Sequence, residues 1–243
     1  MRKFRHKVIR HVPLWLMRRI DYFSYSIERF IFLASREIPA SSKVLDAGSG
    51  ESPFSGYFTG HRYVSIDTQR GDPGWDYSRL DIIGDLTSLP CRQGIFDAVI
   101  CTQVLEHVKE PARVLKELCY VLKQGGVIYL SAPQGWGVHQ APHDYFRFTN
   151  FALRYLLEKV GFEVIFIKPS CGYFGYLANR LTVFPKVVFW QIKPLWLRII
   201  FSPVELISYF VFVIILPVIL NSIDFIDRER NYTLDYFVKA RKL

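Results

Sequence analysis

The chain has 243 residues, of which 50% are hydrophobic and 16% aromatic, and its formal net charge is +9. This length suits one catalytic unit with additions, and the hydrophobic content exceeds what a compact soluble core needs, which indicates apolar surface. The cysteines show no CxxC spacing, which argues against a zinc site and a disulfide framework, so we predict no metal. They are Cys91, Cys101, Cys119 and Cys171.

Basic side chains are concentrated near the start of the chain, interleaved with apolar ones. This mixture favours a membrane surface over nucleic acid, for which no recognition module is present. Arg18, Arg19 and Asp21 interrupt any apolar core of a secretory signal, so we expect the catalytic domain in the cytoplasm. The basic residues are Arg2, Lys3, Arg5, Lys7, Arg10, Arg18 and Arg19.

From Lys43 onward, short β-branched runs alternate with helical stretches, the pattern of a parallel sheet covered by helices. Helices are predicted from Pro111 to about 122 and from about Asn150 to Val160. Residues 232–243 alternate like a strand at the sheet margin and would make a seventh strand. The six parallel strands are predicted at 43–47, 63–67, 81–84, 96–101, 126–131 and 162–168.

These elements predict an α/β fold, Rossmann-like, with a seven-stranded mostly parallel sheet and helices on both faces. Residues 41–170 would form the core, and residues 232–243 would return to its sheet. Residues 1–40 would form a basic and apolar helical extension, and residues 171–231 an apolar helical insertion.

The first strand ends in a glycine-containing turn, residues 46–53 (DAGSGESP), which lets a ligand approach the backbone. Asp46 and Glu51 flank this turn, and Pro53 replaces the third glycine of GxGxxG, so a pyrophosphate would be repelled. S-adenosylmethionine carries a sulfonium, an ammonium group and no phosphate, which suits these carboxylates. Ser52 is predicted to cap a helix that begins at Pro53.

Two further carboxylates follow the next strands. Asp67 ends the second strand, where a carboxylate can accept both ribose hydroxyls, although a simple turn residue also fits. Asp85 closes the third strand and, with the backbone of Leu86, is placed to meet an adenine edge. The alternative for Asp85 is an Asx turn or a helix cap.

Together with residues 94–108 (GIFDAVICTQVLEHV) and 121–133 (VLKQGGVIYLSAP), these motifs closely resemble the class I S-adenosylmethionine-dependent methyltransferases, over about residues 43–166. The family's commoner third loop glycine is here Ser52. The resemblance implies that Thr102 and Gln103 lie near the methionine moiety. It implies cofactor contacts from Asp46, Gly48, Gly50, Asp67, Asp85 and Leu86.

Residues 136–149 supply the acceptor-side candidates, in the phrase His-x-x-Pro-x-Asp-x-x-Arg-x-Thr. This phrase resembles methyltransferases associated with surface-polysaccharide and lipid-linked glycan synthesis, which implies a sugar, lipid or small-molecule hydroxyl acceptor. It makes His139 the candidate general base, oriented by Asp144, with His143 as a second candidate. Alternatively, His139 and Asp144 only pin the loop while Arg147 pairs with Asp144.

Arg147, Glu106 and His107 are the substrate-binding candidates. Glu106 and His107 belong to a Leu-Glu-His-Val motif at the start of the helix after the fourth strand. The alternative for this pair is helix-terminal capping, because a carboxylate there also suits the helix dipole.

Two apolar stretches, residues 181–192 and 196–220, lie between the sixth and seventh strands. Their longest uninterrupted run, residues 206–220, is shorter than the roughly 20 residues of a spanning helix, and Pro217 should kink it. We predict an interfacial or re-entrant hairpin, with burial in the domain or in a homodimer, and a true span, as alternatives. The rival functions are an NAD-type dehydrogenase and a non-catalytic membrane adaptor.

Overall fold

The computed structural model describes residues 14–72, 74–192 and 194–243. These residues form two compact units, which we describe separately. An α/β unit comprises Ile27–Ser170 and Asp235–Leu243, and a helical unit comprises the chain through Ser26 with Cys171–Leu234. Five of the predicted N-terminal basic residues, between Arg2 and Arg10, lie outside the described part of the chain.

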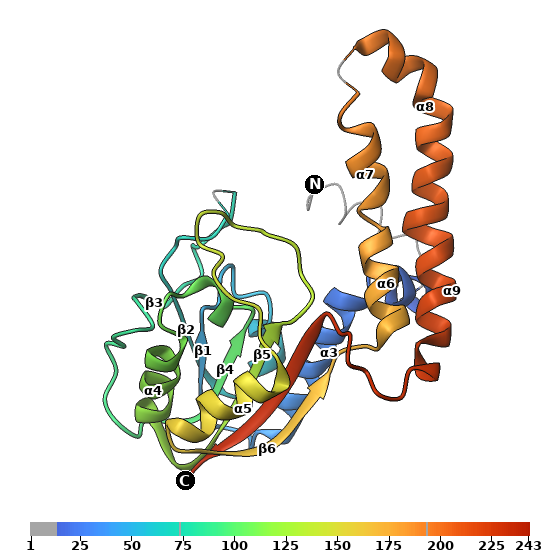
Figure 1. The fold of residues 1–243 in the computed structure, drawn as a ribbon. Helices are drawn as coiled ribbons and strands as arrows, with labels where there is room; N and C mark the ends of the chain where they lie inside the picture. The colour runs from blue at the N-terminus through green and yellow to red at the C-terminus, as the bar shows by residue number, and fades with distance from the viewer. Residues whose placement is uncertain (1–13, 73, 193) are drawn as a thin grey trace. The chain divides into compact units, whose positions relative to one another are not determined.

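A seven-stranded sheet with the order β3-β2-β1-β4-β5-β7-β6 forms the α/β unit (Figure 1). β1 to β5 pair in parallel, whereas β7 pairs antiparallel with both β5 and β6, so six strands run in one direction as predicted. The strands are β1 (Lys43–Ala47), β2 (Arg62–Asp67), β3 (Ile82–Ile83), β4 (Phe96–Thr102), β5 (Leu122–Pro133), β6 (Phe162–Pro169) and β7 (Asp235–Lys242).

The predicted position of the last strand is wrong, because β7 lies inside the sheet and not at its margin. Its alternating pattern suggested an edge, but its charged residues have partners within the unit. Arg241 pairs with Glu163 of β6 at 2.6 Å, and Lys239 pairs with Glu37 of α3 (Tyr22–Glu37). Between these charges, Val238 and Ala240 are fully buried.

Helices cover both faces of the sheet, as predicted. α4 (Pro111–Val121) and α5 (Asn150–Lys159) pack on one face, where Leu115, Leu118 and Leu153 join one core cluster. On the other face, Ile31 of α3 packs with residues of β1, β4 and β5 in a second cluster. Thr149 begins α5 by accepting a hydrogen bond from the Ala152 amide.

The prediction that Ser52 caps a helix is also wrong. Ser52 is buried in a left-handed conformation, with φ of 53°, and only a short 3-10 helix, η1 (Ser55–Phe58), follows. The Ser52 amide donates to the Ser49 carbonyl at 2.9 Å, which closes the loop as a tight turn.

The helical unit is a hairpin of two antiparallel arms (Figure 1). One arm contains α6 (Tyr173–Leu181) and α7 (Phe184–Phe189). The other contains α8 (Leu195–Tyr209), the π-helix η3 (Phe210–Ile215), α9 (Leu216–Ile223) and the short 3-10 helix η4 (Asp224–Ile226). The rings of Phe184 and Phe212, one from each arm, stack with their centroids 4.4 Å apart. The unit also contains α2 (Leu14–Ile20), whose Arg19 exchanges hydrogen bonds with Asn221.

The second arm continues through Pro217, where we predicted a kink. The π-helical turn η3 directly precedes α9, and Pro217 lies in the first turn of α9, where the missing amide proton costs little. Within the described chain, Ile199–Ile226 is the helical stretch that is long and apolar enough to cross a membrane, by length and composition alone.

Candidate functional site

An open cavity of about 360 Å³ lies at the carboxyl ends of β1, β2 and β4. The order of strands explains its position, because the connections after β1 and β4 leave on either side of a crevice. Several predicted site residues line the cavity, whereas Asp46, Gly50, Thr102, Glu106, His139, Asp144 and Arg147 do not. The predicted residues on its wall are Gly48, Asp67, Asp85, Leu86, Gln103, His107 and His143.

The glycine turn comes close to the cavity because Gly48 has no side chain. Its φ is 78°, and a Cβ atom added there would lie 2.4 Å from Cγ2 of Val104. The amides of Gly48 and Ser49 both donate to the Ile66 carbonyl, at 2.8 and 3.1 Å, which ties the turn to β2. A ligand therefore meets backbone along this part of the wall.

Asp67 is held in place by backbone amides. Its carboxylate accepts hydrogen bonds from Gly50 at 3.0 Å and from Gln69 at 2.8 Å, while the residue lines the cavity. A carboxylate has about four acceptor positions, so two remain for ligand hydroxyls. The geometry fits the ribose role that the sequence predicts.

Asp85 forms the Asx turn that was the alternative reading, and it also lines the cavity. One of its carboxylate oxygens accepts from the amide and the hydroxyl of Thr87, both at 2.8 Å. The backbone bond to Thr87 lowers the pKa of Asp85, which therefore stays ionised. Leu86 follows on the same wall.

Asp46 is buried away from the cavity wall. Its carboxyl group accepts a hydrogen bond from the Tyr63 hydroxyl, and burial raises the pKa of Asp46 to about 7. Asp46 thus joins β1 to β2 through Tyr63 beneath the glycine turn. The direct cofactor contact predicted for Asp46 stays a prediction.

The loop after β2 supplies a wall of the cavity that was not predicted from the sequence. Trp75 lines the cavity and packs against two glycines: a Cβ atom at Gly71 would lie 2.5 Å from its indole ring, and one at Gly50 would lie 3.0 Å away. Arg70 and Lys109 add positive charge to the same cavity. The available signal was a tryptophan in a glycine-containing loop directly after Asp67.

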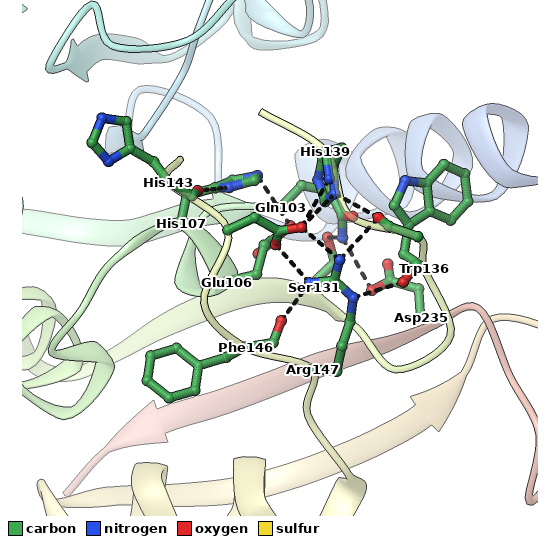
Figure 2. Close-up of polar contacts among 12 residues, drawn as sticks. Gln103, Glu106, His107, Ser131, Trp136, His139, His143, Phe146, Arg147 and Asp235 are labelled. Carbon is green, nitrogen blue, oxygen red and sulfur yellow. Dashed lines mark hydrogen bonds and ion pairs between the residues drawn. The ribbon is translucent and has the colours of Figure 1, made fainter. Parts of the chain in front are cut away.

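The acceptor-side loop is pinned by an ion pair, as the alternative reading proposed. Arg147 donates two hydrogen bonds to Asp144, at 2.7 and 2.8 Å, and one to the carbonyl of Gly137. It also donates to the carbonyl of Trp136, at 2.9 Å (Figure 2). The Arg147 guanidinium holds the pKa of Asp144 well below its usual range. The His139 amide also donates to Asp144, at 2.9 Å.

Two histidines of this loop, His139 and His143, and the neighbouring His107 differ in their access to the cavity. His107 and His143 line it, whereas the His139 ring packs edge-on against His107 with ring centroids 4.7 Å apart. Burial lowers the pKa of His107, which favours its neutral form.

Glu106 lies in a short 3-10 helix, η2 (Leu105–His107), and is fully buried. The capping alternative is wrong for this residue, because neither side-chain oxygen of Glu106 accepts a hydrogen bond from the described residues. Burial raises the pKa of Glu106 to about 8.

Gln103 connects the end of β4 to the last strand. Its side-chain amide donates to the Ser131 hydroxyl and to the Asp235 carboxyl group of β7, each at 3.0 Å. Asp235 is fully buried, and burial raises its pKa to about 8. No sequence signal linked these residues, which are 132 positions apart.

Comparisons with known proteins agree with this geometry. Residues 45–130 match the methyltransferase domain family. The ubiquinone biosynthesis O-methyltransferase of Xanthomonas axonopodis pv. citri is 30% identical over 117 residues, which are 42% of this chain and 48% of that protein. The chain thus spans about half the length of the curated relatives it matches.

Solved structures share the fold at low identity. The [4+2]-cyclase SpnF has a TM-score of 0.56 at 18% identity, with 88% of this chain and 81% of that chain covered. The 1,6-didemethyltoxoflavin-N1-methyltransferase of Burkholderia thailandensis, solved with bound S-adenosylhomocysteine, has a TM-score of 0.52 at 16% identity, with 91% and 81% covered. Both likenesses concern the fold alone.

Proposed function

We propose that this chain, which carries a class I S-adenosylmethionine-dependent methyltransferase domain, transfers the cofactor's methyl group to a hydroxyl oxygen of its acceptor. The observation that carries the proposal is the cavity wall at the carboxyl edge of the sheet. There the backbone at Gly48, the amide-held carboxylate of Asp67 and the turn at Asp85 meet one cavity.

These residues fit S-adenosylmethionine better than a dinucleotide. Asp67 offers its free acceptor positions to ribose hydroxyls, and Arg70 and Lys109 offer positive charge to the cofactor's carboxylate. The NAD-dehydrogenase rival needs a helix N-terminus for the pyrophosphate. Between the glycine turn and β2 the structure has the short 3-10 helix η1 and no α-helix, which argues against that rival.

When bound, S-adenosylmethionine supplies a methyl group activated by a positively charged sulfur atom. Transfer forms a bond between the acceptor oxygen and the methyl carbon, breaks the carbon–sulfur bond and releases the hydroxyl proton. We assign this proton to His143, which lines the cavity and whose Nδ1 lies 3.1 Å from the Tyr145 hydroxyl, leaving Nε2 for the acceptor. His139, the base predicted from the sequence, is set back against His107.

For the acceptor we propose a hydroxyl of a glycan, a lipid-linked glycan or a small molecule, as the His-x-x-Pro-x-Asp-x-x-Arg-x-Thr phrase implies. The helical unit supports a lipid-linked acceptor, because its apolar side chains are exposed. Only 11% of the most apolar window of Ile199–Ile226 is buried. We propose that this hairpin contacts the cytoplasmic surface of a membrane, as a peripheral or re-entrant element.

Methyl transfer is tested by supplying isotope-labelled S-adenosylmethionine with membrane extracts and with a set of soluble hydroxyl acceptors. We expect labelled methyl ethers from the wild type and a loss of about 100-fold or more in His143→Gln. Glu158→Gln, an exposed change on α5, is the control. Cofactor binding without transfer to any pool would contradict the proposal and favour the non-catalytic adaptor.

Membrane contact is tested separately by flotation with vesicles that contain anionic phospholipid. We expect the wild type to float and the double variant Leu206→Ser/Ile207→Ser, which removes two exposed apolar side chains, to float less. A wild type that stays at the bottom as a dimer would show that the hairpin meets a second copy instead.

A further inference from the structure

A group of three side chains lies beside the end of the cavity that holds His143, and the proton transfer proposed for His143 gives it no role. Glu106, His107 and His139 each bring one potential ligand atom to within 4.8 Å of the others. Oε1 of Glu106 lies 3.7 Å from Nε2 of His107. Figure 2 shows the three side chains pointing toward one another, whereas His143 points away from them.

The carboxyl group of Glu106 is buried without a hydrogen-bond donor in the described chain, an environment that a bound cation would satisfy. The side chain is 0% exposed, and neither of its oxygens has a hydrogen-bond partner among the described residues. A buried carboxyl group without a donor is costly and rare in native proteins. The nearby Arg147 guanidinium does not meet this need, because its donors are directed at Asp144 and backbone carbonyls.

The hydrogen bonds of His107 and His139 use Nδ1 of each ring and leave Nε2 available to a metal ion. Nδ1 of His107 lies 2.6 Å from the His143 carbonyl, and Nδ1 of His139 lies 3.1 Å from the Gly137 carbonyl. Since a carbonyl only accepts, Nδ1 must carry the proton in both rings, which leaves Nε2 with a lone pair. Asp144 also lies 3.3 Å from Nδ1 of His139, the arrangement that typically orients a metal-ligating histidine.

We propose that Glu106, His107 and His139 bind a divalent transition-metal ion of the zinc class. Two imidazoles and one carboxylate are a known ligand set for zinc, and three protein ligands leave one coordination position open. Two ligands of one ion lie at most about 4.2 Å apart, so binding would draw the three groups slightly together. His139 and His107 are partly exposed, which provides an entry path for the ion.

The proposed metal site adjoins the cavity through His107. His107 is both a ligand and part of the cavity wall, so the open position of the ion can take an acceptor oxygen there. Binding of the acceptor oxygen by the ion rests on the proposed methyl transfer, whereas metal binding itself does not. We predicted no metal from the cysteine spacing, and a Glu-His pair with a histidine 32 positions later gives no comparable spacing signal.

The test is a titration of the full-length, metal-stripped protein with Co²⁺, followed by its visible d–d absorption. We expect one equivalent to produce the strong bands of a low-coordinate site and Zn²⁺ to displace them. Glu106→Gln and His139→Gln should each weaken cobalt binding by more than about 100-fold, because each removes a direct ligand. Circular dichroism establishes whether the variants are folded. If Glu106→Gln does not fold, the loop variant His139→Gln still tests the site.

His143→Gln is the matched control, because it changes a neighbouring imidazole outside the cluster. It should bind cobalt like the wild type while losing methyl transfer. A folded wild type without d–d bands, or equal cobalt affinity in the wild type and His139→Gln, would overturn the proposal. Cobalt binding by a protein that does not bind S-adenosylmethionine would leave the metal site standing and remove the proposed function.

Discussion

The two units of this chain use the same kinds of apolar side chain in opposite ways. In the α/β unit, Ile100 and Leu115 are fully buried between the sheet and its helices. In the helical unit, Leu206 is 73% exposed and Trp190 is 74% exposed. Burial of an apolar side chain stabilises a fold by roughly 1.5–3 kcal/mol, so the first unit contains its own driving force. The second leaves that surface available to a partner or to lipid.

The largest expected effect is a direct test of this contrast. Leu115→Ala should lower the free energy of unfolding of the α/β unit by about 2–5 kcal/mol, because it opens a cavity in a closed core. Leu206→Ala should change it by less than about 0.5 kcal/mol, because the side chain is exposed. Thermal and denaturant unfolding of both variants measure the difference, and equal losses would show that Leu206 is buried.

The next effect separates the cofactor turn from the rest of the α/β unit. Gly48→Ala should weaken S-adenosylmethionine binding by about 10-fold or more and destabilise the fold by about 1–3 kcal/mol, because φ is positive and Cβ would meet Val104. Gly56→Ala is the matched control, since a Cβ atom there has nothing within 4 Å. Calorimetry and thermal melts measure both terms, and equal behaviour of the two variants would contradict the close approach.

A third effect concerns the carboxyl groups buried in the α/β unit. Burial raises the pKa of Asp235 from 3.8 to about 8, so the folded state holds a proton that the unfolded state releases. Stability from this group is complete below about pH 4 and is lost as the pH rises toward 8. Asp235→Asn should therefore flatten the fall in unfolding free energy between pH 5 and 8 by about 1 kcal/mol or more.

Asp97→Asn provides the control for this profile. Its pairing with Lys123 lowers the pKa of Asp97, so its contribution changes only below about pH 4. Denaturant titrations at several pH values measure the profiles. Asp46 and Glu106, whose pKa values are also raised by burial, keep their own part of the wild-type slope. A slope in Asp235→Asn as steep as that of the wild type would contradict the assignment.

Much of the sheet and of the cofactor wall could be predicted because both depend on local patterns. The apolar runs and the turns at Gly48, Asp67 and Asp85 are read within a few residues, and the predicted parallel strands and the helices at 111–121 and 150–159 are confirmed. The interior position of β7 was not predictable in this way. It depends on pairing partners from distant parts of the chain.

The acceptor side shows the same limit in its side chains. Asp144 and Arg147 are three residues apart in the sequence, and their ion pair was anticipated as an alternative. The approach of His139 to Glu106 and His107, and of Asp235 to Gln103, joins segments that meet only in the folded sheet. The direction of Asp46, toward Tyr63, likewise depends on packing between β1 and β2.

The most direct test of the central claim is calorimetric titration of the purified chain with S-adenosylmethionine and S-adenosylhomocysteine, for the wild type and Asp67→Ala. We predict saturable binding to the wild type and a loss of about 10- to 100-fold in affinity for Asp67→Ala, because charge-assisted bonds to the ribose are removed. A folded wild type that binds neither compound, or binds NAD instead, would contradict the methyltransferase assignment.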